Sequence, residues 1–239
     1  MNKSIRITTP YSASTTKMGP SQAVCLLQDG FTECFEDMKK NNIVLREKYN
    51  AFWAITKSKI VMEKAPSWLD IVRYDAFPIN NRIVRTDVNC IVKDKTGDVL
   101  FRAVEELCVL DGDTRKPRKL STIEYPTDGF EPAILEPCFE TFAIDEDNKI
   151  VSYDQKIYSE YIDMSGHLNN IEYVKLAMNT FSVAFTHEHS IKTMEMHYIR
   201  ECREGDILTI NLYEAGENVF YCKILRQDRL VFEMKMMYD

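Results

Sequence analysis

The stretch "YIDMSGHLNNIEY", residues 161–173, joins a cluster of polar side chains to the start of an amphipathic helix. Apolar residues recur from there at alternating spacings of 3 and 4, at Ile171, Val174, Met178, Phe181 and Phe185. This repeat marks one face of a helix, so the pattern predicts a helix over 168–185. Strand-like segments rich in β-branched and aromatic residues follow at about 191–201, 206–214, 218–226 and 229–238.

The first half of the chain has the same order of elements. A helix is expected over 21–39, with Ser21 as its N-cap and an apolar face made of Val24, Leu27, Phe31, Phe35 and Met38. Strands are expected at 51–63, 70–79, 82–94 and 99–110, with Gly97 at the tip of the last hairpin. "WLDIVRYDAF" (68–77) resembles "EGDILTINLY" (204–213) at an offset of 136 residues, which suggests a duplication.

Each half thus supplies one long apolar helix and a run of antiparallel strands. A curved sheet wrapped around a helix buries both apolar faces, which is the hot-dog arrangement. We therefore expect an α+β protein with a tandem (double) hot-dog fold. Its units are residues 1–115 and 139–239, joined by a linker at 116–138 in a proline-rich stretch without periodicity. The alternative that patterning leaves open is a generic α+β protein of two domains.

Composition limits the classes of function. The chain has 239 residues, 45% of them hydrophobic, and a net charge of -7, which argues against general affinity for nucleic acid. No apolar run approaches the roughly 20 residues of a membrane helix. Seven cysteines without a Cys-x-x-Cys pair, and without histidines at zinc-ligand spacing, predict free thiols and no metal. The Ser- and Thr-rich N-terminus has the composition of a transit peptide, but "SIRIT" (4–8) alternates like a strand, so we expect a cytoplasmic protein.

The polar cluster before the second helix consists of Asp163, Ser165, His167, Asn169 and Asn170. A helix start presents unpaired N–H groups and partial positive charge, which can stabilise an oxyanion. His167 can donate a hydrogen bond or move a proton, and Asp163 can accept a proton, orient water or act as a nucleophile. The same residue types are common helix caps, so both interpretations stay open. The matching "TTKMGPSQ" of the first half has neither His nor Asp, which favours catalysis.

A second polar group lies in "MHYIRECREGD", residues 196–206. In a regular strand Glu201 and Cys202 point to opposite faces. Glu201 as a base and Cys202 as a nucleophile are therefore competing hypotheses, unless a bulge or a strand end lies there. The other histidines, His187, His189 and His197, are assigned no catalytic role.

At these residues the sequence resembles the acyl-acyl carrier protein (acyl-ACP) thioesterases of plants and bacteria. "DMSGHLNNIEYVK" resembles the family's Asp-x-Asn-x-His-x-Asn-Asn segment, and "YIRECREGD" resembles its Tyr-Arg-x-Glu-Cys segment. "FWAITKSKIVMEKAPSWLDIV" in the first half resembles the family's Trp-containing strand and the turn after it. The resemblance covers nearly the whole chain.

The resemblance implies a double hot dog that hydrolyses acyl-ACP thioesters to free fatty acids in fatty acid biosynthesis, without a cofactor. It also implies that the C-terminal unit carries catalysis and that the N-terminal unit shapes the acyl pocket. By position, Asp163, His167 and Glu201 match catalytic residues of the family. Ser165 lies where the family usually has Asn, and Cys202 matches a cysteine proposed as a nucleophile.

The expected partner is acyl carrier protein, with Asn169, Asn170 and Arg200 as candidate substrate-binding residues. Both proteins are acidic, so docking needs a local basic patch. Candidates for this patch are Lys175, Lys192, Arg200, Arg203 and the cluster "RKPRK" at 115–119, which otherwise reads as a solvated linker. Self-association as a homodimer is left open. Two alternatives remain, namely an acyl-CoA thioesterase and a non-catalytic hot-dog acyl-binding protein, which Ser165 favours.

Overall fold

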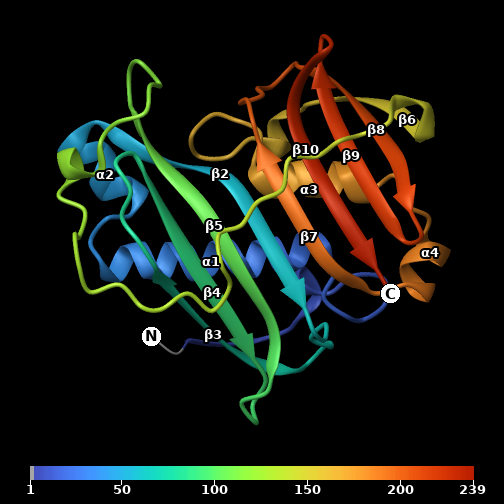
Figure 1. The fold of residues 1–239 in the computed structure, drawn as a ribbon, viewed down its shortest axis with the longest axis horizontal. Coiled ribbons are helices and arrows are strands. Elements are labelled where there is room, and N and C mark those ends of the chain that lie inside the picture. The colour runs from blue at the N-terminus through green and yellow to red at the C-terminus, as the bar shows by residue number, and fades with distance from the viewer. Residues whose placement is uncertain (1–2) are drawn as a thin grey trace.

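The computed structural model describes residues 3–239 and contains one antiparallel 10-stranded sheet with the order β1-β3-β4-β5-β2-β7-β10-β9-β8-β6. The strands are β1 (Lys3–Arg6), β2 (Ala51–Met62), β3 (Ile71–Pro78), β4 (Arg85–Lys93), β5 (Val99–Asp111), β6 (Lys149–Lys156), β7 (Ile191–Tyr198), β8 (Ile207–Gly216), β9 (Val219–Arg226) and β10 (Arg229–Tyr238). The helices α1 (Pro20–Asp37) and α3 (Asn170–Met178) lie on one side of this sheet (Figure 1).

The two halves of the sheet repeat one another. The first runs β1, α1, β2, β3, β4, β5 and the second β6, α3, β7, β8, β9, β10. From the centre outward, the first half has the order β2, β5, β4, β3, β1 and the second half has the corresponding order β7, β10, β9, β8, β6. The halves meet where β2 pairs with β7 along Lys57↔His197 to Val61↔Thr193. Each half wraps its strands around one helix, which confirms the predicted α+β tandem hot-dog fold.

Both predicted helices are present with altered bounds. α1 begins at Pro20 with Gly19 as its N-cap, so the expected cap at Ser21 is wrong; proline is favoured at the first helical position. The predicted helix over 168–185 is wrong in its extent, because α3 ends at Met178 and a separate α4 (Val183–Glu188) follows. Ser182 starts α4 by accepting the N–H of Phe185 at 3.1 Å.

The apolar repeat continues across this break because its last members still pack on the core. The rings of Phe181 and Phe185 lie 5.6 Å and 5.0 Å from the ring of Tyr238 on β10. Sequence periodicity records which residues are buried, and it therefore missed the interruption of the helical hydrogen bonds.

Several elements had no clear sequence signal. α2 (Asn42–Tyr49) is short and is started by Asn41, whose side chain accepts the N–H of Val44 at 2.9 Å. β6 is an edge strand with exposed and half-buried residues, so it lacks a strong apolar pattern. Short 3-10 helices occur at Thr9–Tyr11, Leu120–Ile123, Glu146–Asn148 and Ser159–Tyr161.

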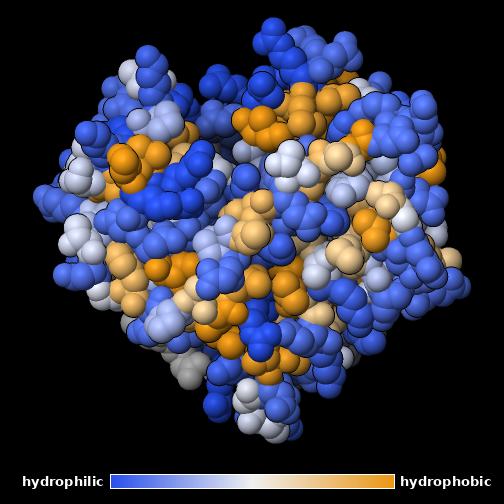
Figure 2. Space-filling model, in the orientation of Figure 1, coloured by the Kyte–Doolittle hydropathy of each residue, from blue (hydrophilic) through white to orange (hydrophobic). Residues whose placement is uncertain are grey.

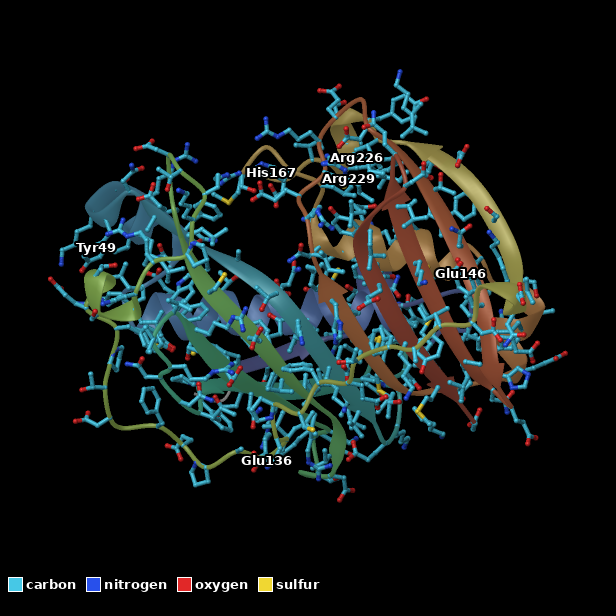
Figure 3. The ribbon with its side chains drawn as sticks, turned by 45° about the horizontal axis from the view of Figure 1, so that its top comes forward. Tyr49, Glu136, Glu146, His167, Arg226 and Arg229 are labelled. Carbon is cyan, nitrogen blue, oxygen red and sulfur yellow. The ribbon has the colours of Figure 1, made fainter. Side chains whose placement is uncertain are left out.

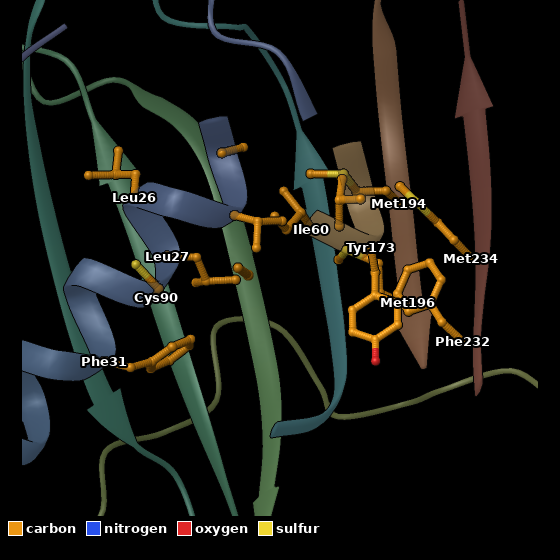
Figure 4. Packing of buried hydrophobic residues seen from close by; sticks show 14 of the residues in the cluster. Leu26, Leu27, Phe31, Ile60, Cys90, Tyr173, Met194, Met196, Phe232 and Met234 are labelled. Atoms are coloured by element: carbon orange, nitrogen blue, oxygen red, sulfur yellow. The ribbon is translucent and has the colours of Figure 1, made fainter. Parts of the chain in front are cut away.

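The main core lies between the helices and the sheet (Figure 4). Leu27 and Phe31 of α1, Ile60 of β2 and Met194 of β7 are buried there. Gly30 lets α1 approach closely, because a Cβ at this position would stand 3.4 Å from the side chains of Ala76 and Cys90. A glycine inside α1 therefore spares these two side chains a tight contact.

The segment after β5 crosses the opposite side of the sheet before it reaches β6 (Figure 1). Asn89 on β4 accepts the N–H of Ile134 at 2.7 Å, and Glu195 on β7 accepts the N–H of Glu140 at 2.7 Å. The connection is therefore fastened to both halves. His197 also faces this side, 3.0 Å from Glu195, which places it away from the helices.

Candidate functional site

The sheet topology brings two distant chain segments to one edge. β5 and β7 both pair antiparallel with β2, so they run in the same direction and leave the sheet at the same edge. The turn after β5 carries Arg115, and the loop after β7 carries Glu201. The loop before α3 joins them, because the N–H of Leu168 donates to the carbonyl of Cys202 at 2.8 Å. Figure 3 shows His167 between the two halves, and the space-filling view in Figure 2 is hollowed at its top, between the halves.

Asp163 orders the loop that carries His167. Its Oδ1 accepts the backbone N–H and the hydroxyl of Ser165, at 2.8 Å and 2.5 Å, and faces the N–H of His167 at 3.4 Å. The N–H of Asp163 in turn donates to the carbonyl of His167 at 2.8 Å. Gly166 takes a φ of 80°, which favours glycine. The loop is thus a tight turn held by one carboxylate.

A chain of polar contacts runs from this turn to the loop after β7. Ser165 Oγ lies 3.3 Å from His167 Nδ1, and His167 Nε2 lies 3.1 Å from Glu201 Oε2. The Ser165 hydroxyl donates its one hydrogen to Asp163, so it accepts from Nδ1–H of His167. The inferred tautomer therefore carries its proton on Nδ1 and leaves Nε2 as an acceptor.

The imidazole is enclosed and the carboxylate is accessible. The side chain of His167 is 8% exposed and that of Glu201 is 41% exposed. Burial lowers the pKa of His167, the charge of Glu201 raises it, and the charge of Arg115 lowers it further. The net direction is downward, so His167 is neutral at neutral pH, in agreement with the inferred tautomer.

Arg115 reaches this pair from the other half of the sheet. Its Nη2 lies 2.6 Å from His167 Nε2 and 3.2 Å from Glu201 Oε2, and its guanidinium stacks over Phe52 at 4.4 Å. Asp111 shapes the turn by accepting the N–H of Thr114 at 2.9 Å, and Arg115 has a φ of 59°. Sequence reasoning found Arg115 only as part of the "RKPRK" cluster, because its contacts lie 52 and 86 residues away.

Cys202 points away from this group although it is adjacent to Glu201. Its side chain is buried and contacts Tyr173, and burial raises the pKa of its thiol. β7 ends at Tyr198, so both residues lie beyond the strand, yet their side chains still diverge. Arg226 fixes the loop by donating to the carbonyl of Glu201 at 3.2 Å and to Asp206 at 2.8 Å.

The three candidate substrate-binding residues have local partners. Asn169 is the N-cap of α3 and accepts the N–H of Ile171 at 3.0 Å, and Asn170 is the first residue of that helix. Arg200 is exposed and donates to the carbonyl of Leu230. All three lie beside the His167 loop or the Glu201 loop.

The candidate basic residues do not form one patch. Lys192 pairs with Asp239 at 3.2 Å near the start of β7, at the opposite end of that strand from Glu201. Lys175 pairs with Glu172 at 2.7 Å on α3. The charge of Arg203 lowers the pKa of His167. Arg203 therefore lies at the same edge as Arg115.

Three features are absent from residues 3–239, namely a metal site, a disulfide and a helix able to span a membrane. Within that range no group of His, Cys, Asp and Glu side chains has the arrangement of a metal site. The seven cysteines are free thiols. Among the helices of this described part, none combines the length and the apolar character needed to cross a membrane.

Sequence comparison identifies two family domains in the chain. The model of the acyl-ACP thioesterase N-terminal domain matches residues 14–123, and that of the C-terminal domain matches residues 145–232. A palmitoyl-acyl carrier protein thioesterase of Arabidopsis thaliana is 25% identical over 77% of this chain and 44% of its own length. A dodecanoyl-[acyl-carrier-protein] hydrolase of Umbellularia californica is 25% identical over 79% of this chain and 49% of its own. The chain thus spans about half the length of the curated relatives it matches.

Solved structures share the fold over the whole chain. An acyl-ACP thioesterase from Bacteroides thetaiotaomicron has a TM-score of 0.87 and 20% identity, covering 100% of this chain and 97% of its own. The 12:0-ACP thioesterase from Umbellularia californica has a TM-score of 0.89 and 14% identity, covering 100% of this chain and 96% of its own. At such identities these two structures establish the fold alone. The two family domains cover well over half of the sequence, and the chain therefore belongs to the acyl-ACP thioesterase family.

Proposed function

We propose that this protein hydrolyses fatty acyl-ACP thioesters and releases free fatty acids in fatty acid biosynthesis. The observation that carries the proposal is the polar chain from Asp163 through Ser165 and His167 to Glu201, at the edge of a sheet whose helix-facing side is apolar. Family membership supports the reaction class. The apolar side of the sheet suits a fatty acyl chain.

In the proposed mechanism Glu201 is the general base. Its exposed carboxylate accepts a proton from water as the water oxygen attacks the thioester carbonyl. The oxyanion forms near the start of α3, where N–H groups and partial positive charge stabilise it. Collapse of this intermediate breaks the C–S bond, and the proton passes to the leaving thiolate. His167 borders the reacting water, and Arg115, which contacts both His167 Nε2 and Glu201 Oε2, fixes the orientation of Glu201.

The other candidates have supporting or structural roles in this scheme. Asp163 already accepts hydrogen bonds from its own loop, so it positions His167 through Ser165. Cys202 is buried with a raised pKa, which disfavours a thiolate nucleophile. Arg115 holds His167 and Glu201 together and must yield space to the thioester carbonyl.

We propose the division of labour between the units that the family resemblance implies. Residues 139–239 carry the reacting groups, and residues 1–115 supply α1 and the sheet surface for the acyl chain. Arg115, at the end of the first unit, connects the two functions. Asn169 and Asn170 at the start of α3 lie beside the proposed carbonyl site.

The proposed partner is acyl carrier protein, docking at the edge that carries Arg115, Arg200 and Arg203. Opposite charge at this edge would favour the encounter with an acidic partner. The free thiols fit a reducing, cytoplasmic location. Gel filtration with light scattering tests whether the protein works as a homodimer.

The test is thiol release from acyl-ACP and acyl-CoA substrates of several chain lengths. Wild type is expected to release thiol from acyl-ACP, and Glu201→Gln is expected to lose roughly 100-fold or more in kcat. Glu204→Gln, the same change at an exposed position of the same loop, is the matched control. Faster release from CoA would support the acyl-CoA thioesterase alternative. Binding without release from either substrate would contradict the enzyme proposal and support an acyl-binding protein.

A further inference from the structure

A carboxyl group lies on the helix-facing side of the sheet, near the seam between the halves. Glu105 on β5 is paired with Val88 on β4 and with Ser58 on β2, and Ser58 is paired with Met196 on β7. Residues directly opposite one another in an antiparallel sheet share a face. These four residues therefore form one row, and all four are fully buried.

The neighbouring row identifies this face. Ala103 and Ile60 lie two residues from Glu105 and Ser58 and pair with each other. Side chains two residues apart point to the same side of a strand. Ile60, Met194 and Met196 lie on the side of the helices in Figure 4. The row of Glu105 thus belongs to the surface on which the proposed function places the acyl chain.

Glu105 has unused hydrogen-bonding capacity. Its Oε1 accepts the hydroxyl of Ser58 at 2.8 Å, whereas its Oε2 has no hydrogen-bond partner among the described residues. Burial raises the pKa of Glu105 to about 8, so the group is mainly protonated at neutral pH and can donate as well as accept. A buried polar atom without a partner is costly and therefore points to a missing ligand group.

The fold itself does not require this pair. β7 and β10 of the second half correspond to β2 and β5 of the first. On their helix-facing side they carry methionines, Met194 and Met196 on β7 and Met234 and Met236 on β10. The second half therefore builds the same surface without a carboxyl group. Packing alone does not explain why the first half carries Glu105 there.

A series of packed side chains connects the pair to the edge of the sheet that carries Glu201. The hydroxyl of Tyr198 donates to the sulfur of Met196, the partner of Ser58, at 3.9 Å, and Tyr198 is the last residue of β7, three positions before Glu201. Its ring lies 6.1 Å from that of Tyr173, whose hydroxyl donates to the carbonyl of Arg200 at 3.3 Å. A chain entering at Glu201 would pass these rings before it reaches Glu105. The flexible Met196 beside Ser58 can shift to admit it.

Building on the proposed function, we propose that Glu105 and Ser58 form a polar subsite that selects acyl chains carrying a hydroxyl group. Glu105 Oε2 exchanges a hydrogen bond with the substrate hydroxyl, and Ser58 holds the other carboxyl oxygen in place. An unsubstituted chain would leave Oε2 buried and unpaired. A site built to pair a hydroxyl discriminates strongly against the analogue that lacks it.

The test compares dodecanoyl-ACP with hydroxydodecanoyl-ACPs that carry the hydroxyl near the thioester, at mid-chain or near the methyl end. Wild type is expected to favour one hydroxylated position by ~10-fold or more in kcat/KM. Glu105→Met, which copies the residue type of the second half, should lose this preference and still hydrolyse the unsubstituted chain. Glu105→Gln, which keeps hydrogen-bonding groups, should retain part of it. Glu106→Gln is the matched control, because Glu106 faces the opposite side and pairs with Arg82 at 3.0 Å.

Calorimetric binding of the free dodecanoic and hydroxydodecanoic acids gives a readout that does not need turnover. Hydrolysis of the unsubstituted chain without preference for any hydroxylated one would overturn the subsite and leave the proposed function intact. Absence of all hydrolysis would overturn the proposed function, and the binding data would then decide the subsite. Equal affinity for plain and hydroxylated acids would reject it. These wild-type measurements hold even if Glu105→Met fails to fold.

Discussion

Replacing Arg115 with Ala tests whether the first half of the sheet controls the chemistry of the second. In the structure Arg115 Nη2 lies 2.6 Å from His167 Nε2 and donates a hydrogen bond to its lone pair. Its charge also lowers the pKa of His167, whereas the charge of Glu201 raises it. Without Arg115, Nε2 can take a proton and bond directly to Glu201 Oε2 at 3.1 Å. The pKa of His167 should therefore rise.

The size of the stability effect follows from the contacts that are lost. The side chains of Arg115 and Glu201 are 31% and 41% exposed, so their ion pair contributes about 0.2–1 kcal/mol. The stacking on Phe52 at 4.4 Å adds about 0.5–1 kcal/mol. We expect a total loss of about 1–2 kcal/mol, which lowers Tm by roughly 2–8 °C in a chain of this size.

The assay is the pH profile of kcat/KM for acyl-ACP hydrolysis. In Arg115→Ala the acidic limb should move to higher pH, because a protonated His167 ties up the Glu201 carboxylate. Arg73→Ala, at an exposed position on the remote β3, serves as the control and should leave the profile unchanged. A drop in Tm with an unmoved acidic limb would refute the reasoning, because Arg115 would then be a structural contact alone.

Three further predictions concern single side chains. Ser165→Asn should preserve or raise kcat, because Asn offers donors and an acceptor at the same place. Ser165→Ala should lower kcat by up to ~10-fold, because His167 Nδ1 loses its partner. A collapse of kcat in Ser165→Asn would contradict this role. Cys202→Ala should keep most activity but lose about 1–2 kcal/mol of stability from the buried side chain, and abolished activity in a folded variant would restore the thiol as nucleophile. Glu105 has a folded pKa of about 8, above its ordinary value of 4.5, so its contribution to stability is full below pH ~4.5 and is lost as the pH rises through about 8. Glu105→Gln lacks this loss, so its Tm relative to wild type should rise between pH 5 and 9. The difference in free energy of unfolding should grow by about 1.4 kcal/mol for each pH unit between the two pKa values. Parallel plots of Tm against pH for the two proteins would show that the carboxyl is not buried as described.

The fold was readable from the sequence wherever local pattern and burial coincide. β3 and β8 begin at Ile71 and Ile207, as the duplicated segments "WLDIVRYDAF" and "EGDILTINLY" predict. The helix before Met178 and its polar N-terminus were also evident. The predicted helix ran on to residue 185 because Phe181 and Phe185 keep the spacing of the apolar face, although they are half-buried and pack on the core outside α3. α2 and the edge strand β6 were missed because few of their residues are buried.

The sequence alone determined the tandem architecture and half of the candidate site, because the repeated pattern of apolar residues and the turn around His167 are local properties. The sequence left open whether Glu201 and Cys202 diverge, because that expectation needed a regular strand and β7 ends at Tyr198. Only the tertiary structure joined Arg115 to His167 and Glu201 across 52 and 86 residues. The pairing of β2 with β7 sets the ends of β5 and β7 side by side, and no local pattern encodes which strands of the two halves become neighbours.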